Sequence, residues 1–317
     1  MQKSQVPLYI VSGMFFFILC TLLFVLVKKH NQKSDAYKIG ILVTATHPSL
    51  DAAVAGFQEE LKKVMGASVV FIVKNIQGSV SNAHTVAQSF HADPTVMGIY
   101  AVGTLAAQAA SQWEHEKPIF IAAVTDPGAA GIADAPNVCG SVDTVDMVQV
   151  ISVIRALVPS VRSIGILFNS SEANSQFLVK KMRAAVMNVG LIAQEYPVTQ
   201  ESEIPVATEH AIKNADVLWA PTDNTVASTI AFIAHKAVDA QKPLVISFLA
   251  PARLGWLAMV GVDYYAAGVM TALCAYDVLK NEKSPSDIGF LRPKKDSVEI
   301  DKHTAAVLQI KIPADFS

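Results

Sequence analysis

The sequence predicts an α/β protein with two Rossmann-like lobes and parallel sheets. Short apolar runs alternate with helical stretches from residue 38 to about residue 300, in the repeated order strand, turn, helix. This alternation favours parallel sheets covered by helices on both faces. The series starts again at Ser163, so we expect two lobes, with about ten strands between them, instead of one large sheet.

The first series contains the most regular helix. Leu50, Phe57 and Leu61 belong to an apolar stripe with steps of three and four that ends near Gly66. The strands predicted for this series are 38–43, 67–73, 98–102, 118–124 and 137–142. Of the helices between and after them, one ends near residue 91, one opens at residues 103–108 and one covers about 145–157.

The second series repeats this order and ends in a tail. Its predicted strands are 163–168, 191–198, 216–220, 243–248 and 257–264. Its predicted helices end near residue 188 or cover 204–213, 226–238 and 266–279. A charged linker at 280–286 precedes a strand at 297–300 and a short helix.

The stretch from Leu8 to Val27 carries no charged residue and predicts one transmembrane helix. Twenty residues at about 1.5 Å each match the ~30 Å hydrocarbon core of a bilayer. A cleaved secretory signal is the alternative, but no Ala-x-Ala site follows Val27. Lys28, Lys29 and Lys33 follow the stretch and by themselves favour a cytoplasmic C-terminal part.

The charge balance excludes one broad class of partner. The whole chain has a net charge of −2, and without residues 1–35 it has 21 basic and 26 acidic residues, a net charge of −5. A nucleic-acid-binding domain needs a basic face, so we expect no nucleic-acid partner. The cysteines show no metal-ligand spacing, and a Cys139–Cys274 disulfide has no support beyond the count.

Polar turns that follow predicted strands are the candidate binding residues, because ligands of parallel α/β sheets bind at the carboxyl ends of strands. The candidates are Thr46, His47, Gly103, Thr104, Thr125, Asp126, Glu172, Asn174, Asp223 and Asn224. Each also has a purely structural explanation. Asp223 is a good helix N-cap, Asp126 precedes a proline in a turn, and Gly103 suits any tight turn.

The candidate turns differ in charge: one is uncharged and others are negatively charged. Gly103-Thr104 is uncharged and opens a helix, whose free N–H groups and dipole favour an anion such as a carboxylate. Asp126, Glu172 and Asp223 supply negative charge, which suits an ammonium group. A cleft that contains both types would hold a zwitterion.

The common enzyme signatures are missing from the sequence. It contains no Gly-x-Ser-x-Gly, His-Glu-x-x-His, phosphate-loop or Gly-x-Gly-x-x-Gly motif. We therefore expect no catalytic residue, metal site or cofactor. The less favoured alternative is an enzyme in which His47, Asp126 and Asp223 meet in one cleft and transfer protons.

The turns occur in an order that resembles a known family, the ABC-transporter substrate-binding proteins of the tryptophan/tyrosine-uptake type. The resemblance covers residues 37–312 and rests on His47-Pro-Ser-Leu-Asp51, Gly103-Thr104, Thr125-Asp126-Pro127, Glu172-Ala-Asn-Ser175, Pro221-Thr-Asp-Asn-Thr-Val226 and Gly261-Val-Asp-Tyr-Tyr265. The chain departs from the family at Cys139, where threonine is usual, at Asp301, where asparagine is common, and in lacking a lipoprotein cysteine context.

The resemblance implies the type I periplasmic binding protein fold, with a three-crossover hinge. The expected domains are 1–36 as membrane anchor and linker, 37–142 plus 257–284 as the first lobe, and 143–256 plus 285–317 as the second. The first crossover is expected near Val142, the second between Ala250 and Leu257, and the third within 281–297.

The resemblance also implies roles for the candidate residues. Gly103-Thr104 would bind a carboxylate, Asp223 with Asn224 would bind the amino group, and the remaining turns would line the cleft. The ligand would be an amino acid, and the partners would be an ABC permease and its ATPase. The resemblance and the lysine residues after Val27 imply opposite orientations, and we follow the resemblance. We therefore expect a single-pass protein of the bacterial cytoplasmic membrane with its binding domain outside. A ligand-sensing module that acts on a separate signalling partner is the alternative.

Overall fold

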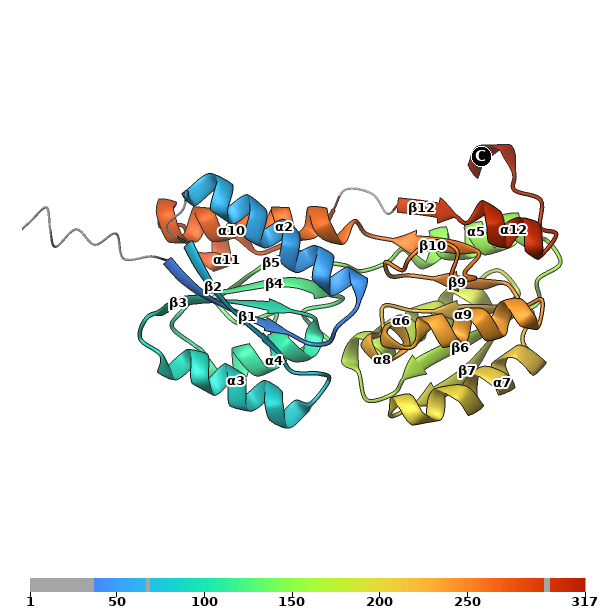
Figure 1. Ribbon diagram of the computed structural model, residues 1–317, viewed down its shortest axis with the longest axis horizontal. Helices are drawn as coiled ribbons and strands as arrows, with labels where there is room; N and C mark the ends of the chain where they lie inside the picture. Colours follow the sequence, from blue (N-terminus) through green and yellow to red (C-terminus); the bar gives the residue numbers. More distant parts are fainter. Residues whose placement is uncertain (1–36, 67–68, 294–296, 317) are drawn as a thin grey trace, which may run out of the picture. The chain divides into compact units, whose positions relative to one another are not determined.

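The computed structural model describes residues 37–66, 69–293 and 297–316, which form two six-stranded sheets (Figure 1). The strand orders are β11-β5-β4-β3-β1-β2 and β12-β10-β9-β8-β6-β7. Each sheet with its helices is a lobe, and both lobes belong to one compact unit, Lys38–Ser317. The predicted α/β fold with two lobes is confirmed.

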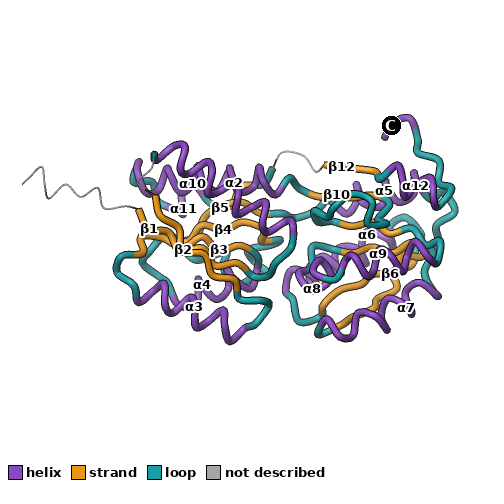
Figure 2. Tube along the Cα trace, viewed as in Figure 1, coloured by secondary structure: helices purple, strands orange, loops and turns teal. Residues whose placement is uncertain are grey.

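The first lobe has helices on both faces of its sheet, with α2 and α10 on one face and α3 and α4 on the other (Figures 1 and 2). Its elements are β1 (Tyr37–Val43), α2 (Pro48–Met65), β2 (Val69–Asn75), α3 (Val80–Ala92), β3 (Val96–Val102), α4 (Thr104–Trp113), β4 (Ile119–Val124), β5 (Val138–Val142), α10 (Tyr264–Asn281), α11 (Pro285–Ile288) and β11 (Phe290–Leu291).

Two glycines bring α2 and α10 into backbone contact. A Cβ at Gly56 would lie 2.2 Å from the carbonyl oxygen of Tyr265, and one at Gly268 would lie 2.1 Å from that of Ala53. Only glycine permits this approach. Beneath α2, the rings of Phe57 and Tyr100 stack at 3.8 Å between centroids, which fixes the helix over the sheet.

The second lobe repeats the alternation of strands and helices. Its elements are α5 (Met147–Leu157), β6 (Ser163–Asn169), α6 (Ala173–Met187), β7 (Ile192–Val198), η1 (Glu201–Glu203), α7 (Ile204–Asn214), β8 (Val217–Ala220), α8 (Asn224–Ser228), α9 (Ile230–Asp239), β9 (Leu244–Ile246), β10 (Ala258–Gly261), β12 (Ser297–Ile300), α12 (Lys302–Val307) and η2 (Ala314–Phe316).

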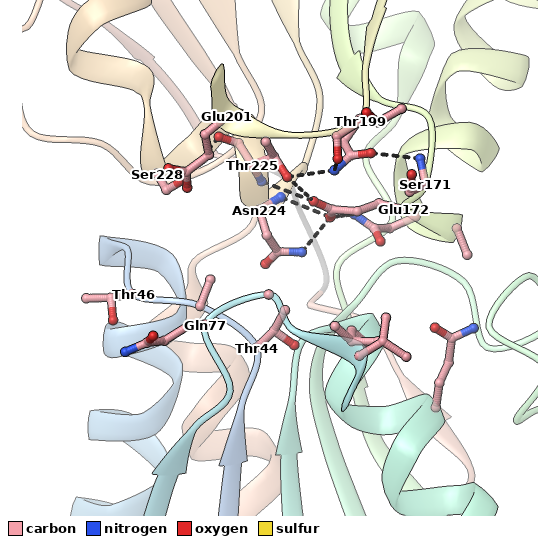
Figure 3. A pocket seen from close by; sticks show the side chains of 18 residues that line it. Thr44, Thr46, Gln77, Ser171, Glu172, Thr199, Glu201, Asn224, Thr225 and Ser228 are labelled. Atoms are coloured by element: carbon pink, nitrogen blue, oxygen red, sulfur yellow. Dashed lines mark hydrogen bonds between the residues drawn. The ribbon is translucent and has the colours of Figure 1, made fainter. Parts of the chain in front are cut away.

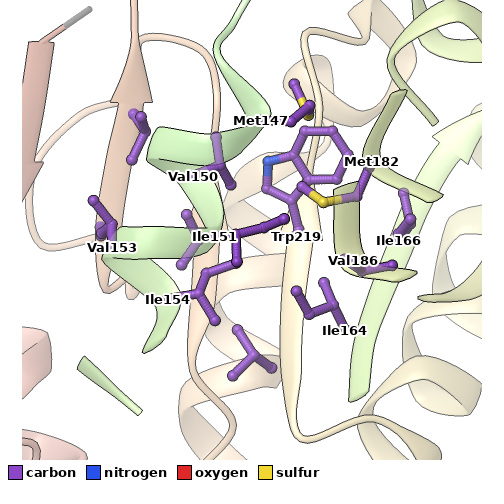
Figure 4. Close-up of a cluster of buried hydrophobic side chains, with 14 of the residues drawn as sticks. Met147, Val150, Ile151, Val153, Ile154, Ile164, Ile166, Met182, Val186 and Trp219 are labelled. Atoms are coloured by element: carbon purple, nitrogen blue, oxygen red, sulfur yellow. The ribbon is translucent and has the colours of Figure 1, made fainter. Parts of the chain in front are cut away.

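Trp219 lies in the core of the second lobe, among side chains of α5, α6 and β6 (Figure 4). Its indole N–H donates to Ser247 Oγ at 2.9 Å, so the only polar atom of this buried side chain is paired. All seven residues of β6 are buried, as expected for a parallel strand covered on both faces.

The chain passes between the lobes three times, after Val142, after Gly261 and after Leu291. The second crossover was expected between Ala250 and Leu257, and that prediction is wrong. β10 pairs with β9 and with β12, so residues 258–261 belong to the second lobe. β11 pairs with β5, so residues 290–291 belong to the first. An apolar run fits either sheet, and only its pairing partner decides which.

The helix predicted at 226–238 is divided at Thr229 into α8 and α9. Thr229 Oγ1 donates to the carbonyl oxygens of Thr225 and Val226 at 3.0 and 3.1 Å, and this local bonding competes with a regular helix. Cys139 and Cys274 are buried and unbridged.

The predicted membrane span and linker, residues 1–36, lie outside the described residues. Within the described part of the chain, no helix combines the length and the apolar character that a membrane crossing needs.

Candidate functional site

A cavity of about 540 Å³ lies between the lobes (Figure 3). The first lobe contributes residues that follow β1, β2 and β3, among them Thr44, Gln77 and Leu105. The second contributes residues that follow β6, β7 and β8, among them Glu172, Thr199 and Asn224. Every group therefore stands at the carboxyl end of a strand, where parallel sheets bind ligands.

Glu172 is the most heavily hydrogen-bonded side chain of the cavity (Figure 3). Its Oε1 accepts from the backbone N–H and the hydroxyl of Thr225, both at 3.0 Å. Its Oε2 accepts from the N–H of Asn224 at 3.0 Å, from Asn224 Nδ2 at 2.6 Å and from Asn174 Nδ2 at 3.0 Å. Glu172 precedes α6 but binds the N-terminus of α8, where the helix dipole favours its charge.

Asp223 lies beside Glu172 and is buried, with 2% of its surface exposed. It is the N-cap of α8, because Oδ1 accepts from the N–H of Val226 at 2.8 Å. Oδ2 accepts from the N–H of Asn169 at 2.5 Å and from Ser175 Oγ at 2.6 Å. Burial, followed by the charge of Glu172, raises the pKa of Asp223 to about 8. The ion pairs of the described residues include neither carboxylate.

A second space, a chamber of about 20 Å³, lies against the cavity and shares Asn174 and Asn224 with it. Its wall combines His47, Thr125, Asp143 and Tyr264 with Thr222 and Asp223. Asp143 accepts hydrogen bonds from the hydroxyls of Thr125 at 2.9 Å and Tyr264 at 2.8 Å. Tyr264 is thus buried, and it follows the second crossover directly.

The lobes meet at this chamber through polar contacts. His47 Nε2 lies 3.3 Å from Asn224 Oδ1, and the hydroxyl oxygens of Thr125 and Thr222 lie 3.1 Å apart. Burial lowers the pKa of His47, although the contact with Asn224 and the charges of Glu172 and Asp51 act in the opposite direction. A neutral imidazole is therefore favoured here.

Gly103 and Thr104 form the N-terminus of α4 beneath the cavity but contribute to neither wall. Gly103 has φ 93°, and a Cβ there would lie 2.5 Å from Thr44 Oγ1. That hydroxyl accepts from the N–H of Ala106 at 3.2 Å, so Thr44 caps the helix from the neighbouring strand. Two neighbouring residues do line the cavity: Thr44, which caps the helix, and Leu105, which follows Thr104 in the chain.

The remaining candidates divide between the site and the surface. Thr46 lines the cavity and accepts a hydrogen bond from Asn75 at 2.9 Å. Asn174 lines both spaces and donates to the carbonyl oxygen of Thr222 at 2.7 Å. Asp126 lines neither, and its Oδ1 accepts from the N–H of Ala129 at 2.7 Å, the bond of a turn residue.

Several lining residues were not among the candidates. They are Gln77, Gln108, Thr199, Glu201, Thr225 and Ser228 around the cavity, with Asp143 at the chamber. Gln77, Thr199 and Glu201 follow predicted strands, so their position was the signal that could have identified them. Asp143 follows β5 directly, at the first crossover.

Comparison with known proteins decides the family. The family model described as ABC transporter substrate binding protein matches residues 38–317. The chain belongs to this family. The resemblance read from the ordered turns is confirmed, and membership makes an ABC transporter and a small-molecule ligand its partners.

Relatives of this substrate-binding protein bind aromatic amino acids. A tyrosine-binding protein of Clostridioides difficile (strain R20291) is 30% identical over 297 residues, which cover 90% of this chain and 86% of the relative. A Streptococcus pneumonia ABC domain solved in complex with L-Trp has a TM-score of 0.82 at 30% identity, covering 87% of this chain and 96% of that chain.

A ligand-free, open substrate-binding protein with adhesive properties from Clostridium difficile has a TM-score of 0.68 at 28% identity, covering 88% of this chain and 97% of that chain. The named relatives are thus a tyrosine-binding protein, an ABC domain solved with L-Trp and a substrate-binding protein.

Proposed function

We propose that this protein captures a small zwitterion, an amino acid, between its two lobes and presents it to an ABC importer. The observation that carries this proposal is the pair of neighbouring carboxylates, Asp223 and Glu172, in a cleft without a cationic partner among the described residues. Two carboxylates that face each other in a buried site favour a bound cation. The ammonium group of an amino acid supplies that charge.

The α-carboxylate of the ligand would lie over α4. The first N–H groups of a helix are not used by the helix itself and attract anions. Gly103 holds this helix start against Thr44, and the cavity wall begins at the next residues. A carboxylate over Gly103-Thr104 and an ammonium group near Asp223 would bridge the lobes and stabilise their closed arrangement.

The size of the cavity and the named relatives favour an aromatic side chain. A space of about 540 Å³ falls within the range of small-molecule sites. Its lining, however, contains no aromatic ring. We therefore extend the ligands of the relatives, tyrosine and tryptophan, to this chain as the first candidates for testing.

Isothermal titration calorimetry of the purified full-length chain against the twenty amino acids tests this function. We expect binding in the micromolar range, about −8 kcal/mol, for one or a few of them. Asp223→Ala should abolish binding and leave the circular dichroism spectrum unchanged. Asp126→Ala is the matched control, since Asp126 lines neither space. Full affinity in Asp223→Ala would reject the role assigned to this carboxylate.

The anchoring segment is part of the proposal. An uncleaved span from Leu8 to Val27 would hold the binding domain outside the cytoplasmic membrane, beside the permease. Membrane fractionation with external protease should find the chain in the membrane and residues after 37 digested in spheroplasts. Protection of those residues would place the domain in the cytoplasm and reject the orientation. Ligand recovered chemically unchanged after incubation would distinguish binding from catalysis.

A further inference from the structure

His47, a wall residue of the chamber between the lobes, has a buried ring nitrogen without a hydrogen-bond partner among the described residues. His47 has 7% of its surface exposed, and its Nδ1 finds no partner in the described part of the chain. Nearly all buried polar atoms of native proteins are paired, so each exception requires an explanation. A bound group that completes the site is one such explanation.

The protonation of His47 follows from its neighbours. Asn224 Nδ2 donates to Glu172 Oε2 at 2.6 Å, which turns the amide oxygen of Asn224 toward His47. Nε2 of His47, at 3.3 Å from that oxygen, must therefore carry the proton. In the neutral ring Nδ1 is then an acceptor with a free lone pair.

The chamber fits a small cation. Its volume of about 20 Å³ suffices for one water-sized group. Asp143 and Asp223 line it, while Thr125, Tyr264 and Asn174 already donate to protein oxygens. The chamber therefore offers negative charge and a free acceptor.

We propose that this chamber receives the ammonium group of the ligand and that His47 accepts one of its hydrogen bonds through Nδ1. This inference rests on the proposed function, because it assigns the headgroup of the same ligand. An ammonium group is water-sized and brings three N–H donors and one positive charge. The rest of the ligand extends past Asn174 and Asn224 into the larger cavity, which shares both residues with the chamber.

The assignment requires a neutral His47. A protonated ring would direct an N–H group and a positive charge at the ammonium. The charged groups around His47 are Asp51 on its own helix, Asp143 at the crossover, and Glu172 and Asp223 on the second lobe, with the phenol of Tyr264 also in the wall. Burial outweighs the nearest of these charges and lowers the pKa of His47, so closure favours the acceptor form.

A series of N-methylated ligands tests the chamber on the wild-type chain. The probes are L-tryptophan, Nα-methyl-L-tryptophan and Nα,Nα-dimethyl-L-tryptophan, with the corresponding tyrosine series. Because the chamber has room for one water-sized group, we expect about a tenfold loss of affinity for the first methyl group and no measurable binding for the second. Equal affinity for the parent and the monomethyl compound would overturn the proposal.

Variants of His47 test the acceptor. His47→Phe keeps a ring but removes the lone pair, and about a tenfold or larger loss of affinity is expected. His47→Gln provides a carbonyl acceptor and should recover part of that affinity. At acidic pH, where protonation of the imidazole adds to the effect of Asp223, the affinity of His47→Gln should fall less than that of the wild type. His235→Gln on the exposed surface of α9 is the control for loss of a histidine and should bind as the wild type does.

The outcomes separate this proposal from the proposed function. Melting temperatures identify a variant that fails to fold, and the methylated series needs no variant. If the wild type binds no amino acid, the proposed function and this inference are both rejected. If amino acids bind but neither N-methylation nor His47→Phe changes the affinity, only the role of the chamber and of His47 is rejected.

Discussion

The hydroxyl oxygens of Thr125 and Thr222 lie 3.1 Å apart, although one residue follows β4 in the first lobe and the other follows β8 in the second. Both side chains are buried, with 1% and 7% of their surfaces exposed. A buried hydrogen bond between two bodies is formed when they close and lost when they open. This pair therefore contributes to the free energy of closure.

Removing the Thr222 hydroxyl should weaken ligand binding more than it destabilises the fold. Thr222→Val deletes the contact between lobes, and we expect a three- to tenfold increase in Kd, equivalent to about 0.5–1.5 kcal/mol. Calorimetric titration measures the change. Thr208→Val is the matched control, because Thr208 Oγ1 is buried without a hydrogen-bond partner among the described residues. An equal loss of affinity in both variants would show that the contact has no special role.

Ligand binding should release a proton. Asp223 has a pKa raised to about 8 by burial and by Glu172, so most molecules of the empty protein hold this proton at pH 7. A bound ammonium group favours the ionised carboxylate, so affinity should rise with pH between about 5 and 8 and level off above 8. Titrations at pH 7 in phosphate and in Tris, which differ in ionisation enthalpy, measure the release.

Asp126→Asn should leave that proton release unchanged, because Asp126 lies in neither wall. A binding enthalpy independent of the buffer would contradict the assignment of Asp223 as the titrating group.

The stability of the empty protein should fall as pH rises from about 4 to 8. The folded state holds the Asp223 proton up to about pH 8, whereas the unfolded chain loses it near the ordinary value for aspartate. The unfolded state therefore binds fewer protons across this window, and the free energy of unfolding decreases with pH, in total by on the order of 5 kcal/mol. Urea unfolding at several pH values, without ligand, measures this. In Asp223→Asn the contribution should be absent.

Gly103→Ala should destabilise the protein and weaken binding together. The residue has φ 93°, and its Cβ would lie 2.5 Å from Thr44 Oγ1, which caps α4. We expect a loss of about 1–3 kcal/mol. Gly190→Ala is the control, because φ is 72° there and nothing lies near the added atom. It should show the backbone cost alone, with affinity unchanged. An equally small effect at both glycines would argue against close packing at Gly103.

The regular parts of the fold were predictable from the sequence because their signals are local. The strands β1, β3, β4 and β6 and the helix α2 all lie where apolar runs and the stripe through Leu50, Phe57 and Leu61 placed them. The lobe to which β10 belongs was not predictable in this way. Its four buried residues would satisfy either sheet, and the choice depends on β9 and β12.

The sequence was enough to predict which turns contribute to the candidate site, but not how their side chains are arranged in space. Position after a strand was enough to select Thr46, Glu172, Asn174 and Asn224, which line the cavity. Asp126 has the same position and residue type as Asp223, yet it binds only its own turn. The difference arises from the neighbouring turn of the same lobe, because Asn169 and Ser175 bind the carboxylate of Asp223 in a buried position, whereas Asp126 is only half-buried.

The three crossovers have a consequence for synthesis on the ribosome. Each sheet receives a strand from the last part of the chain, β11 at Phe290–Leu291 in one and β12 at Ser297–Ile300 in the other. A nascent polypeptide of 280 residues therefore has two unfinished edges at once, each able to pair with another chain. Translation that stops shortly before the end should therefore yield fragments that aggregate, and not a fragment with one correctly folded lobe.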